Sequence, residues 1–339
     1  MEKWLFVVVL LVVMFSCKNN SKTTTETTTQ TEKIKKIFPS DVIPFMDKWK
    51  ILLGDGSKTD TLVKYKKKGF FYVENDDEAD WVVYKTPNAG ITSPNSSNTR
   101  TELGEKKRWI PETGGKLTGT LKVQHVSTTG EATVPSSYSV VVGQIHSDEG
   151  HKNEPLKIYF KKFPGHTKGS VFWNYEINTK GDNSGRWDFS TAVWGYDFSV
   201  VGANSNTYPE EPKDGIALGE AFTYKVNVYK GIMYLTFTRG GHESVKFTKN
   251  LLKSDFSKRS YRPQQVTEIY TLRGRNGVEQ ENAYAGEKQF FKQGAYNQAN
   301  EKSTKSETYK GDIAKQYENG SYAEVWFKEA SVGLSTPPL

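Results

Sequence analysis

Side chains able to bind an anion and transfer protons share faces of three predicted strands. The segment 290–298 is one of them. Strand alternation places Lys292, Tyr296 and Gln298 on one side of it and Phe291 on the other. A core strand rarely carries an ammonium, a phenol and an amide along one side. The pattern therefore indicates a polar groove for an anionic substrate.

Two other segments show the same pattern. Gln144 and His146 share one face of a predicted strand, and Arg100 and Glu102 share one face of another. A guanidinium binds both oxygens of a carboxylate in one plane, and an imidazole or a phenol can transfer a proton. We therefore expect an Arg, a Gln, a His, a Tyr and a Lys to line a single groove.

The elements that must position these residues are strands. Runs of β-branched and aromatic residues recur along the chain, separated by Gly, Asn, Asp and Pro. No long segment has a helical period, so we predict an all-β fold, either a β-sandwich or a jelly roll. The stretch that leads to Leu53 is expected to hold a short helix or turn, and a hairpin is predicted across Lys230-Gly231. The predicted strands are Gly69–Glu74, Asp80–Lys85, Gly119–Ser127, Ser139–His146, Lys157–Lys162, Val171–Ile177, Phe222–Tyr229, Ile232–Thr238, Lys288–Gln298 and Tyr322–Lys328.

Two segments exceed ordinary loop length, at about 147 to 170 and about 178 to 219. Long loops on a compact domain commonly form lids or binding walls. The second contains Trp187, Trp194 and Tyr196, which could stack on sugar rings or form a satellite core. Its length also suggests a wall at one end of the groove, which would favour release of product from chain ends.

Three blocks of the sequence resemble the signature blocks of polysaccharide lyase family seven, the alginate lyases. They are Arg100-Thr101-Glu102-Leu103, Gln144-Ile145-His146 and the segment 291–298, in the family's order. With the region between them they span most of residues 40 to 330. The resemblance implies a β-jelly roll whose concave sheet binds alginate and cleaves it by β-elimination, without a metal or an organic cofactor.

The blocks also depart from the family's pattern. Gly104 stands where the family usually has a second Arg, which removes a cation from the groove and leaves substrate preference open. Gln293-Gly294-Ala295 stands where Ala-Gly-Val is common. Ile145 resembles the form of the second block that accepts guluronate, which hints at guluronate or mixed substrate.

The resemblance implies catalytic roles for four residues. Arg100 and Gln144, with His146 nearby, would bind the uronate carboxylate and stabilise an enolate-like intermediate. Tyr296 would take the C5 proton, protonate the leaving oxygen, or do both. A phenol ordinarily has a pKa of ~10, so a base role needs a neighbouring cation. For mannuronate one phenol could serve as base and acid, whereas for guluronate His146 is the better base.

Further residues receive supporting roles. We expect Glu102 to orient Arg100, and Lys292, Asn297 and Gln298 to line substrate subsites. Each candidate also has a structural interpretation, such as a buried imidazole or a surface ion pair. A non-catalytic carbohydrate-binding lipoprotein on the same fold is the alternative function. A glycoside hydrolase is a third, but the acidic stretch 74–78 looks like a solvated turn rather than a catalytic carboxylate pair.

The first residues resemble an export signal. Lys3 precedes an apolar run of about a dozen residues, too short to span a bilayer. The run ends just before Cys17, the only cysteine, so residues 1–16 resemble a lipoprotein signal whose product is lipidated at Cys17; a plain secretory signal is the alternative. Residues 17–37 read as a disordered Thr-rich tether and 38–339 as the catalytic domain. We expect an outer-membrane lipoprotein, periplasmic or surface-facing, or a secreted protein.

The composition narrows the partners. The net charge is +7, which suits a polyanion such as an acidic polysaccharide or a nucleic acid. The basic residues are scattered and no nucleic-acid-binding motif is present. We therefore expect alginate or its oligosaccharides as the partner, no nucleic acid, membrane contact only through the lipid anchor, and a monomer.

Overall fold

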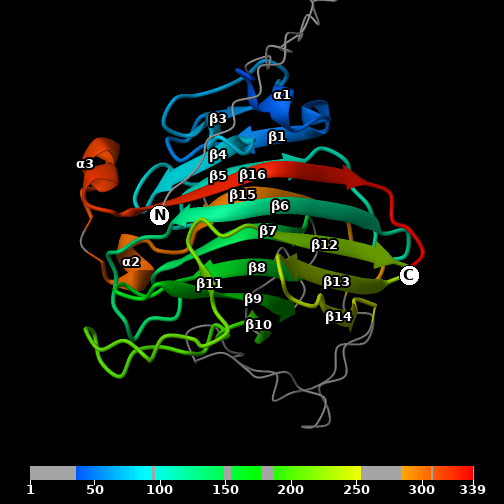
Figure 1. Ribbon diagram of the computed structural model, residues 1–339. Coiled ribbons are helices and arrows are strands. Elements are labelled where there is room, and N and C mark those ends of the chain that lie inside the picture. The colour runs from blue at the N-terminus through cyan, green and yellow to red at the C-terminus, as the bar shows by residue number, and fades with distance from the viewer. Residues whose placement is uncertain are drawn as a thin grey trace, which may run out of the picture. The chain divides into compact units, whose positions relative to one another are not determined.

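Alternating strands build two antiparallel sheets that pack face to face (Figure 1). The computed structural model describes residues 36–93, 96–148, 154–177, 187–252, 284–306 and 308–338. The predicted signal, Cys17 and nearly all of the tether lie outside these residues. No helix among them is long and apolar enough to cross a membrane.

The sheet that carries the candidate residues, here called the site sheet, has nine strands. They are β1 (Trp49–Leu52), β2 (Lys58–Thr59), β5 (Arg100–Glu105), β7 (Ser139–Ser147), β8 (Leu156–Lys161), β9 (Lys168–Ile177), β10 (Trp187–Trp194), β11 (Ile216–Ala217) and β15 (Gln289–Asn297). Their order is β10-β9-β8-β7-β15-β5-β1-β2, with β11 paired to β9.

The other sheet, here called the back sheet, has seven strands in the order β14-β13-β12-β6-β16-β4-β3. Only short helices accompany the two sheets: α1 (Pro39–Val42), the 3₁₀ turn Met46–Lys48, α2 (Glu301–Thr304) and α3 (Ile313–Glu318). The back-sheet strands are β3 (Phe71–Asn75), β4 (Asp80–Pro87), β6 (Gly115–His125), β12 (Phe222–Tyr229), β13 (Ile232–Arg239), β14 (Val245–Asn250) and β16 (Tyr322–Gly333).

The core lies between the sheets and takes the apolar partners of the candidate residues. Leu103, Ile145 and Phe291 have no exposed surface and belong to one large cluster with back-sheet residues such as Val325 and Phe327. Burying each such side chain contributes about 1.5–3 kcal/mol. The apolar positions therefore fix which face of each strand points outward, as alternation predicts, and the all-β prediction is confirmed.

The predicted hairpin is also confirmed. β12 and β13 pair from Tyr229 with Ile232 onward, and the two turn residues Lys230 and Gly231 have φ angles of 48° and 80°. Two successive positive φ angles are typical of a type I′ turn, whose twist matches that of the strands. A local sequence signal thus predicts two adjacent strands of the back sheet, β12 and β13.

The prediction of a loop over residues 178–219 is wrong in part. β10 occupies Trp187–Trp194, because polar residues such as Asp188 and Ser190 alternate there with apolar ones. The short strand β11 lies further along the same segment. Trp194 is buried in the core with its ring against Phe222, so it is not free to stack on a sugar. The stretch leading to Leu53 holds α1 and a 3₁₀ turn as expected, but it ends in strand β1.

A bulge in β7 sets where its side chains point. Val141 pairs with Tyr159 and Gly143 with Ile158, so β7 holds one residue more than β8 at this point. A Cβ on Gly143 would lie 2.7 Å from the Tyr224 hydroxyl, toward the core. The extra residue lets Val141 and Gln144 face outward together.

Candidate active site

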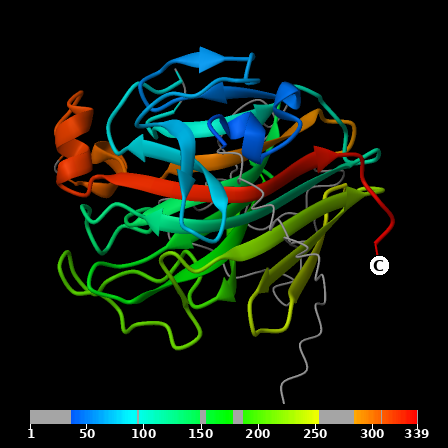
Figure 2. The same cartoon turned by 45° about the horizontal axis from the view of Figure 1, so that its top comes forward.

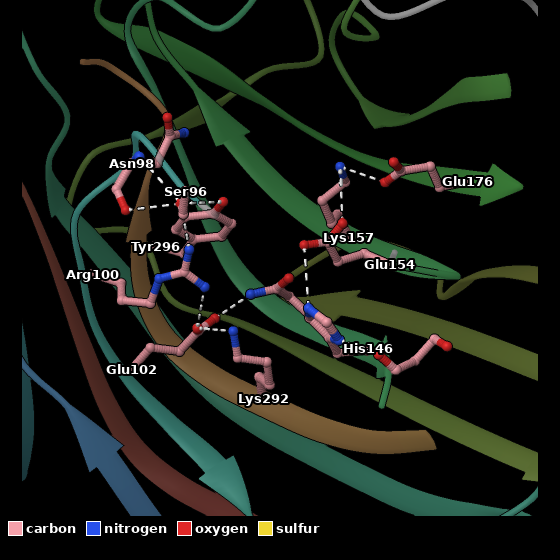
Figure 3. Close-up of polar contacts among 12 residues, drawn as sticks. Ser96, Asn98, Arg100, Glu102, His146, Glu154, Lys157, Glu176, Lys292 and Tyr296 are labelled. Atoms are coloured by element: carbon pink, nitrogen blue, oxygen red, sulfur yellow. Dashed lines mark hydrogen bonds and ion pairs between the residues drawn. The ribbon is translucent and has the colours of Figure 1, made fainter. Parts of the chain in front are cut away.

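Strands β7, β15 and β5 are neighbours, and they bring the predicted residues together on the outer face of the site sheet (Figure 3). Tyr296 pairs with Arg100 across β15 and β5, and Lys292 pairs with Gln144 across β15 and β7. Gly294 between them has a φ of 143°, and a Cβ there would lie 2.6 Å from a backbone oxygen of β5. Only glycine fits this close approach.

Glu102 is the centre of the polar contacts. Its Oε2 lies 2.6 Å from Lys292 Nζ and 3.6 Å from Arg100 Nη1, and its Oε1 accepts a hydrogen bond from the Gln144 amide. Its side chain is almost fully buried. Burial lowers the pKa of Lys292, and Glu102 opposes this effect. Two cations around one carboxylate leave a local positive charge, which suits a uronate carboxylate.

Arg100 stacks on the phenol of Tyr296. The guanidinium carbon lies 3.8 Å from the ring centroid, and Lys292 Nζ lies 5.6 Å from it. Ser96 Oγ accepts a 2.8 Å hydrogen bond from Arg100 Nη2 and lies 3.4 Å from the Tyr296 hydroxyl. Burial opposes the charge of Arg100, but the oxygens of Tyr296 and Glu102 outweigh it and raise the guanidinium pKa.

His146 lies on the same face, near the C-terminal end of β7 (Figure 3). Its ring packs against Phe290 with 5.1 Å between centroids. Its Nδ1 lies 2.6 Å from the carbonyl oxygen of Ser147, and its Nε2 lies 3.7 Å from Glu154 Oε1. Burial lowers the pKa of His146, aided by Lys292 and opposed by Glu154. The imidazole is therefore neutral at pH 7 and can accept a proton.

Two other predicted substrate-binding residues, Asn297 and Gln298, lie at the end of β15. Asn297 has no exposed surface, and its side chain bonds to Asn88 and to the backbone of Ala299. It follows Tyr296 directly, so it points to the opposite side of β15, and the prediction that it lines a subsite is wrong. Gln298 lies just past the strand end, is 5% exposed, and donates to the carbonyl oxygen of Tyr296.

The segment between β10 and β11, drawn as yellow-green loops at the lower left of Figure 2, packs against one end of the site face through Phe198. Phe198 from this segment packs over Tyr159 and Phe172, with ring centroids 5.1 and 5.6 Å apart, and Tyr296 borders the same cluster. Buried Lys161 anchors the segment, since its Nζ donates to the carbonyl oxygen of Val200 at 3.0 Å and to that of Pro135 at 2.9 Å. This part of the segment therefore packs on the site face next to Tyr296.

The comparisons with known proteins address the same region of the chain. The alginate lyase family model matches residues 43–333. The chain belongs to the alginate lyase family. An alginate lyase from Klebsiella pneumoniae is 29% identical over 268 residues, which is 69% of this chain and 73% of that relative. The expected resemblance to family seven is confirmed.

Solved structures of alginate lyases share the fold. The exolytic PL7 alginate lyase AlyA5 from Zobellia galactanivorans is 68% identical, with a TM-score of 0.85, over 90% of this chain and all of that one. The structure of the Klebsiella pneumoniae alginate lyase superposes with a TM-score of 0.62 at 23% identity, over 89% of this chain and all of that one. These matches confirm the jelly-roll prediction.

Other residues at the site carry no local sequence signal. Ser96 lies in a loop, and only folding brings it to Arg100 and Tyr296. Glu154 lies just before β8, and folding brings it close to His146 on β7.

Lys157 on β8 does have a local signal and could have been found, because charges at alternate positions of a strand indicate a polar face. It lies 2.7 Å from Glu176, whose negative charge outweighs burial and raises the pKa of Lys157 well above its usual range.

Several expectations about other polar residues also have structural outcomes. His125 lies on the back sheet, away from the site face, stacked on Tyr322 with its Nε2 3.1 Å from the carbonyl oxygen of Gly320. The acidic stretch 74–78 forms the turn between β3 and β4, where Asp76 pairs with Lys122. Within the described part of the chain, no group of three or more His, Cys, Asp or Glu residues is arranged to hold a metal ion.

Proposed function

We propose that this alginate lyase cleaves the 1,4-glycosidic bonds of alginate by β-elimination, acting from chain ends, with Tyr296 and His146 as its proton-transfer residues. The observation that carries the proposal is the stack of Arg100 on Tyr296, 3.8 Å from the ring centroid. It puts a fixed cation for the uronate carboxylate beside a phenol that can transfer a proton. Glu102 holds that cation at 3.6 Å and Lys292 at 2.6 Å.

The elimination first needs a stabilised carbanion at C5. Removing the C5 proton adds negative charge next to an existing carboxylate, so donors must face that carboxylate. Arg100 supplies two N–H groups in a plane, and the Gln144 amide adds a third when it exchanges its bond to Glu102 for one to substrate. A preorganised donor of this kind is worth about 3–4 kcal/mol in the transition state.

Proton transfer then completes the reaction. The electron pair of the C5–H bond forms the C4–C5 double bond, and the bond from C4 to the glycosidic oxygen breaks. In mannuronate Tyr296 takes the C5 proton and protonates the leaving oxygen. In guluronate the proton lies on the other side of the ring, so Nε2 of His146 takes it while the Tyr296 hydroxyl protonates the oxygen. Each proton transfer contributes about 10²–10⁴ in rate.

Action at chain ends is inferred from the segment that packs next to Tyr296. Phe198 and Lys161 fix the segment between β10 and β11 over one end of the site face. We expect a segment fixed there to stop a long polymer at that end, so that the substrate enters by a terminus. The exolytic activity named for the relative that is 68% identical supports the same conclusion.

The test of the chemistry compares two tyrosine variants. Tyr296→Phe should lower the rate of unsaturated product formation, followed by ultraviolet absorbance, by about 10²–10⁴. Tyr234→Phe is the control, because Tyr234 is also half-buried on a strand but lies in the back sheet. A Tyr296→Phe enzyme near the wild-type rate refutes the role of Tyr296. Product without ultraviolet absorbance would instead indicate hydrolysis, and no product would indicate a binding protein.

The test of chain-end action uses the unmodified protein. Solution viscosity and unsaturated ends are recorded together during digestion of long alginate. Cleavage at termini should release small products from the start while viscosity falls in proportion to conversion. A steep loss of viscosity at low conversion would show cleavage within chains and refute the proposal.

We also infer that the protein is an exported lipoprotein of the outer membrane, acylated at Cys17. The apolar run that ends directly before the only cysteine supports this. Labelled fatty acid should enter the wild type but not a Cys17→Ser variant, and fractionation should move that variant out of the membrane. Equal labelling of both proteins would refute the inference.

A further inference from the structure

A carboxylate lies between the site and a second group of charges. Glu154 Oε1 is 3.7 Å from His146 Nε2, and Glu154 Oε2 is 3.8 Å from Lys157 Nζ (Figure 3). Its side chain is 17% exposed. Lys157 lies closer to Glu176, at 2.7 Å, so that carboxylate satisfies most of its charge. The other carboxylate oxygen of Glu154, Oε1, faces His146.

The other ring nitrogen of His146 decides what this contact means. Nδ1 lies 2.6 Å from the Ser147 carbonyl oxygen, which only accepts hydrogen bonds, so Nδ1 carries the hydrogen. In the neutral imidazole Nε2 then has a free lone pair and faces a carboxylate. That contact is weakly repulsive in the neutral form and attractive once Nε2 is protonated.

We propose that Glu154 is a positioning residue for His146, whose carboxylate stabilises the imidazolium that forms when Nε2 takes the C5 proton. This inference rests on the proposed lyase function and deepens it. The C5 proton goes to Nε2, the electron pair forms the double bond, and the Tyr296 hydroxyl protonates the leaving oxygen. Water then takes the proton from the imidazolium and returns one to the phenolate.

The surrounding charges make such a partner necessary. Arg100 on β5 and Lys292 on β15 both disfavour a proton on His146, and so does burial of the ring. Asp148, at the end of β7, is paired with Arg108 at 2.7 Å. Within the described part of the chain, further charged neighbours of the ring are Glu154 and, beyond it, Lys157. Glu154 is thus the main group that offsets the two cations.

The test replaces Glu154 with Gln, which has a similar shape but no charge. In Glu154→Gln the imidazolium loses its stabilising neighbour, so the pKa of His146 falls further. The acid limb of kcat/KM on guluronate blocks should move down by about one pH unit, as expected for one charge at this distance in a partly solvated site. The rate on the plateau should fall about threefold to tenfold, because Nε2 becomes a weaker base. Glu154→Asp, which restores the charge, should recover part of the shift.

A control variant and a second measurement keep the inference testable. Glu324→Gln removes a carboxylate of similar exposure, paired with Lys85 at 3.0 Å on the back sheet, and should leave the acid limb in place. The ring protons of His146 can be titrated by NMR without substrate, assigned by the signal lost in His146→Asn among five histidines. Glu154→Gln should lower that midpoint by a similar amount.

The outcomes separate this inference from the proposed function. If unsaturated product forms but neither the acid limb nor the midpoint moves in Glu154→Gln, the inference is refuted and the lyase function stands. An equal shift in Glu324→Gln would also refute it. If the wild type releases no unsaturated product, the proposed function fails, while the NMR midpoints still report on the contact.

Discussion

The contacts of Glu102 predict a specific energetic coupling. Its carboxylate is buried 2.6 Å from Lys292 Nζ and 3.6 Å from Arg100 Nη1. Replacing it with Gln keeps the shape but leaves two nearly buried cations without their shared anion. Breaking a buried ion pair on one side costs about 3–5 kcal/mol, so Glu102→Gln should lower the free energy of unfolding by that amount.

A second substitution tests whether the cost is electrostatic. Lys292→Met alone should cost less, about 1–3 kcal/mol, because Glu102 retains Arg100 and the Gln144 hydrogen bond. In the double variant one uncompensated cation is gone. Its loss of stability should therefore be smaller than the sum of the two single losses by at least about 1 kcal/mol.

The contact between Glu102 and Lys292 also makes the stability depend on pH. Glu102 opposes the lowering of the Lys292 pKa by burial, so Glu102→Gln lowers this pKa further. The unfolded chain then binds more protons than the folded one below the ordinary lysine pKa of ~10.4. Stability lost in Glu102→Gln should therefore be recovered as pH rises toward that value.

Urea unfolding of the four proteins at pH 7.5 and pH 9.5 measures both effects. The expected result is a positive coupling energy together with a smaller deficit of Glu102→Gln at the higher pH. Strict additivity of the two substitutions, or a deficit that grows with pH, would refute the assignment of Glu102 as the shared anion. A loss of activity alone would not, because both residues border the substrate site.

Two further predictions concern residues around the site. Asn297→Ala should lower the free energy of unfolding by about 1–3 kcal/mol, because it leaves Asn88 without its buried partner, while KM for alginate stays unchanged; a raised KM at wild-type stability would contradict this. Burial lowers the pKa of Lys161 to about 7, opposed by Asp197. Its folded pKa lies below the unfolded value of ~10.4, so the wild type should gain about 1.4 kcal/mol per pH unit from this group between pH ~7 and ~10. Lys161→Met should lack this gain in urea unfolding, and equal pH slopes for the two proteins would refute it.

Strand alternation was sufficient to predict the composition of the site face for three strands. Arg100 with Glu102, Gln144 with His146, and Lys292 with Tyr296 each share a side because residues two or four apart on a strand face the same way. The prediction for Asn297 did not follow this rule, which places it on the opposite side of β15 from Tyr296. Its neighbour Tyr296 was placed correctly, but the amide of Asn297 bonds to Asn88, a residue more than two hundred positions earlier.

The strand over Trp187–Trp194 was missed for a related reason. Its outward positions hold Asp188 and Ser190, which in isolation resemble a polar loop. These residues are nevertheless buried in the folded protein, and Asp188 lies 4.0 Å from Lys157. Burial of a polar side chain depends on its partners, and the partners come from other parts of the chain.

The sequence by itself determined the family, the fold class and which side chains leave each strand together, since these depend on local alternation and on residue type. Only the tertiary structure decided that β5, β15 and β7 are neighbours, that Glu102 joins two cations, and that Glu154 faces His146. It also placed Phe198 over one end of the site. Such contacts join residues far apart in the chain, so they are set by the packing of the two sheets and not by any short segment.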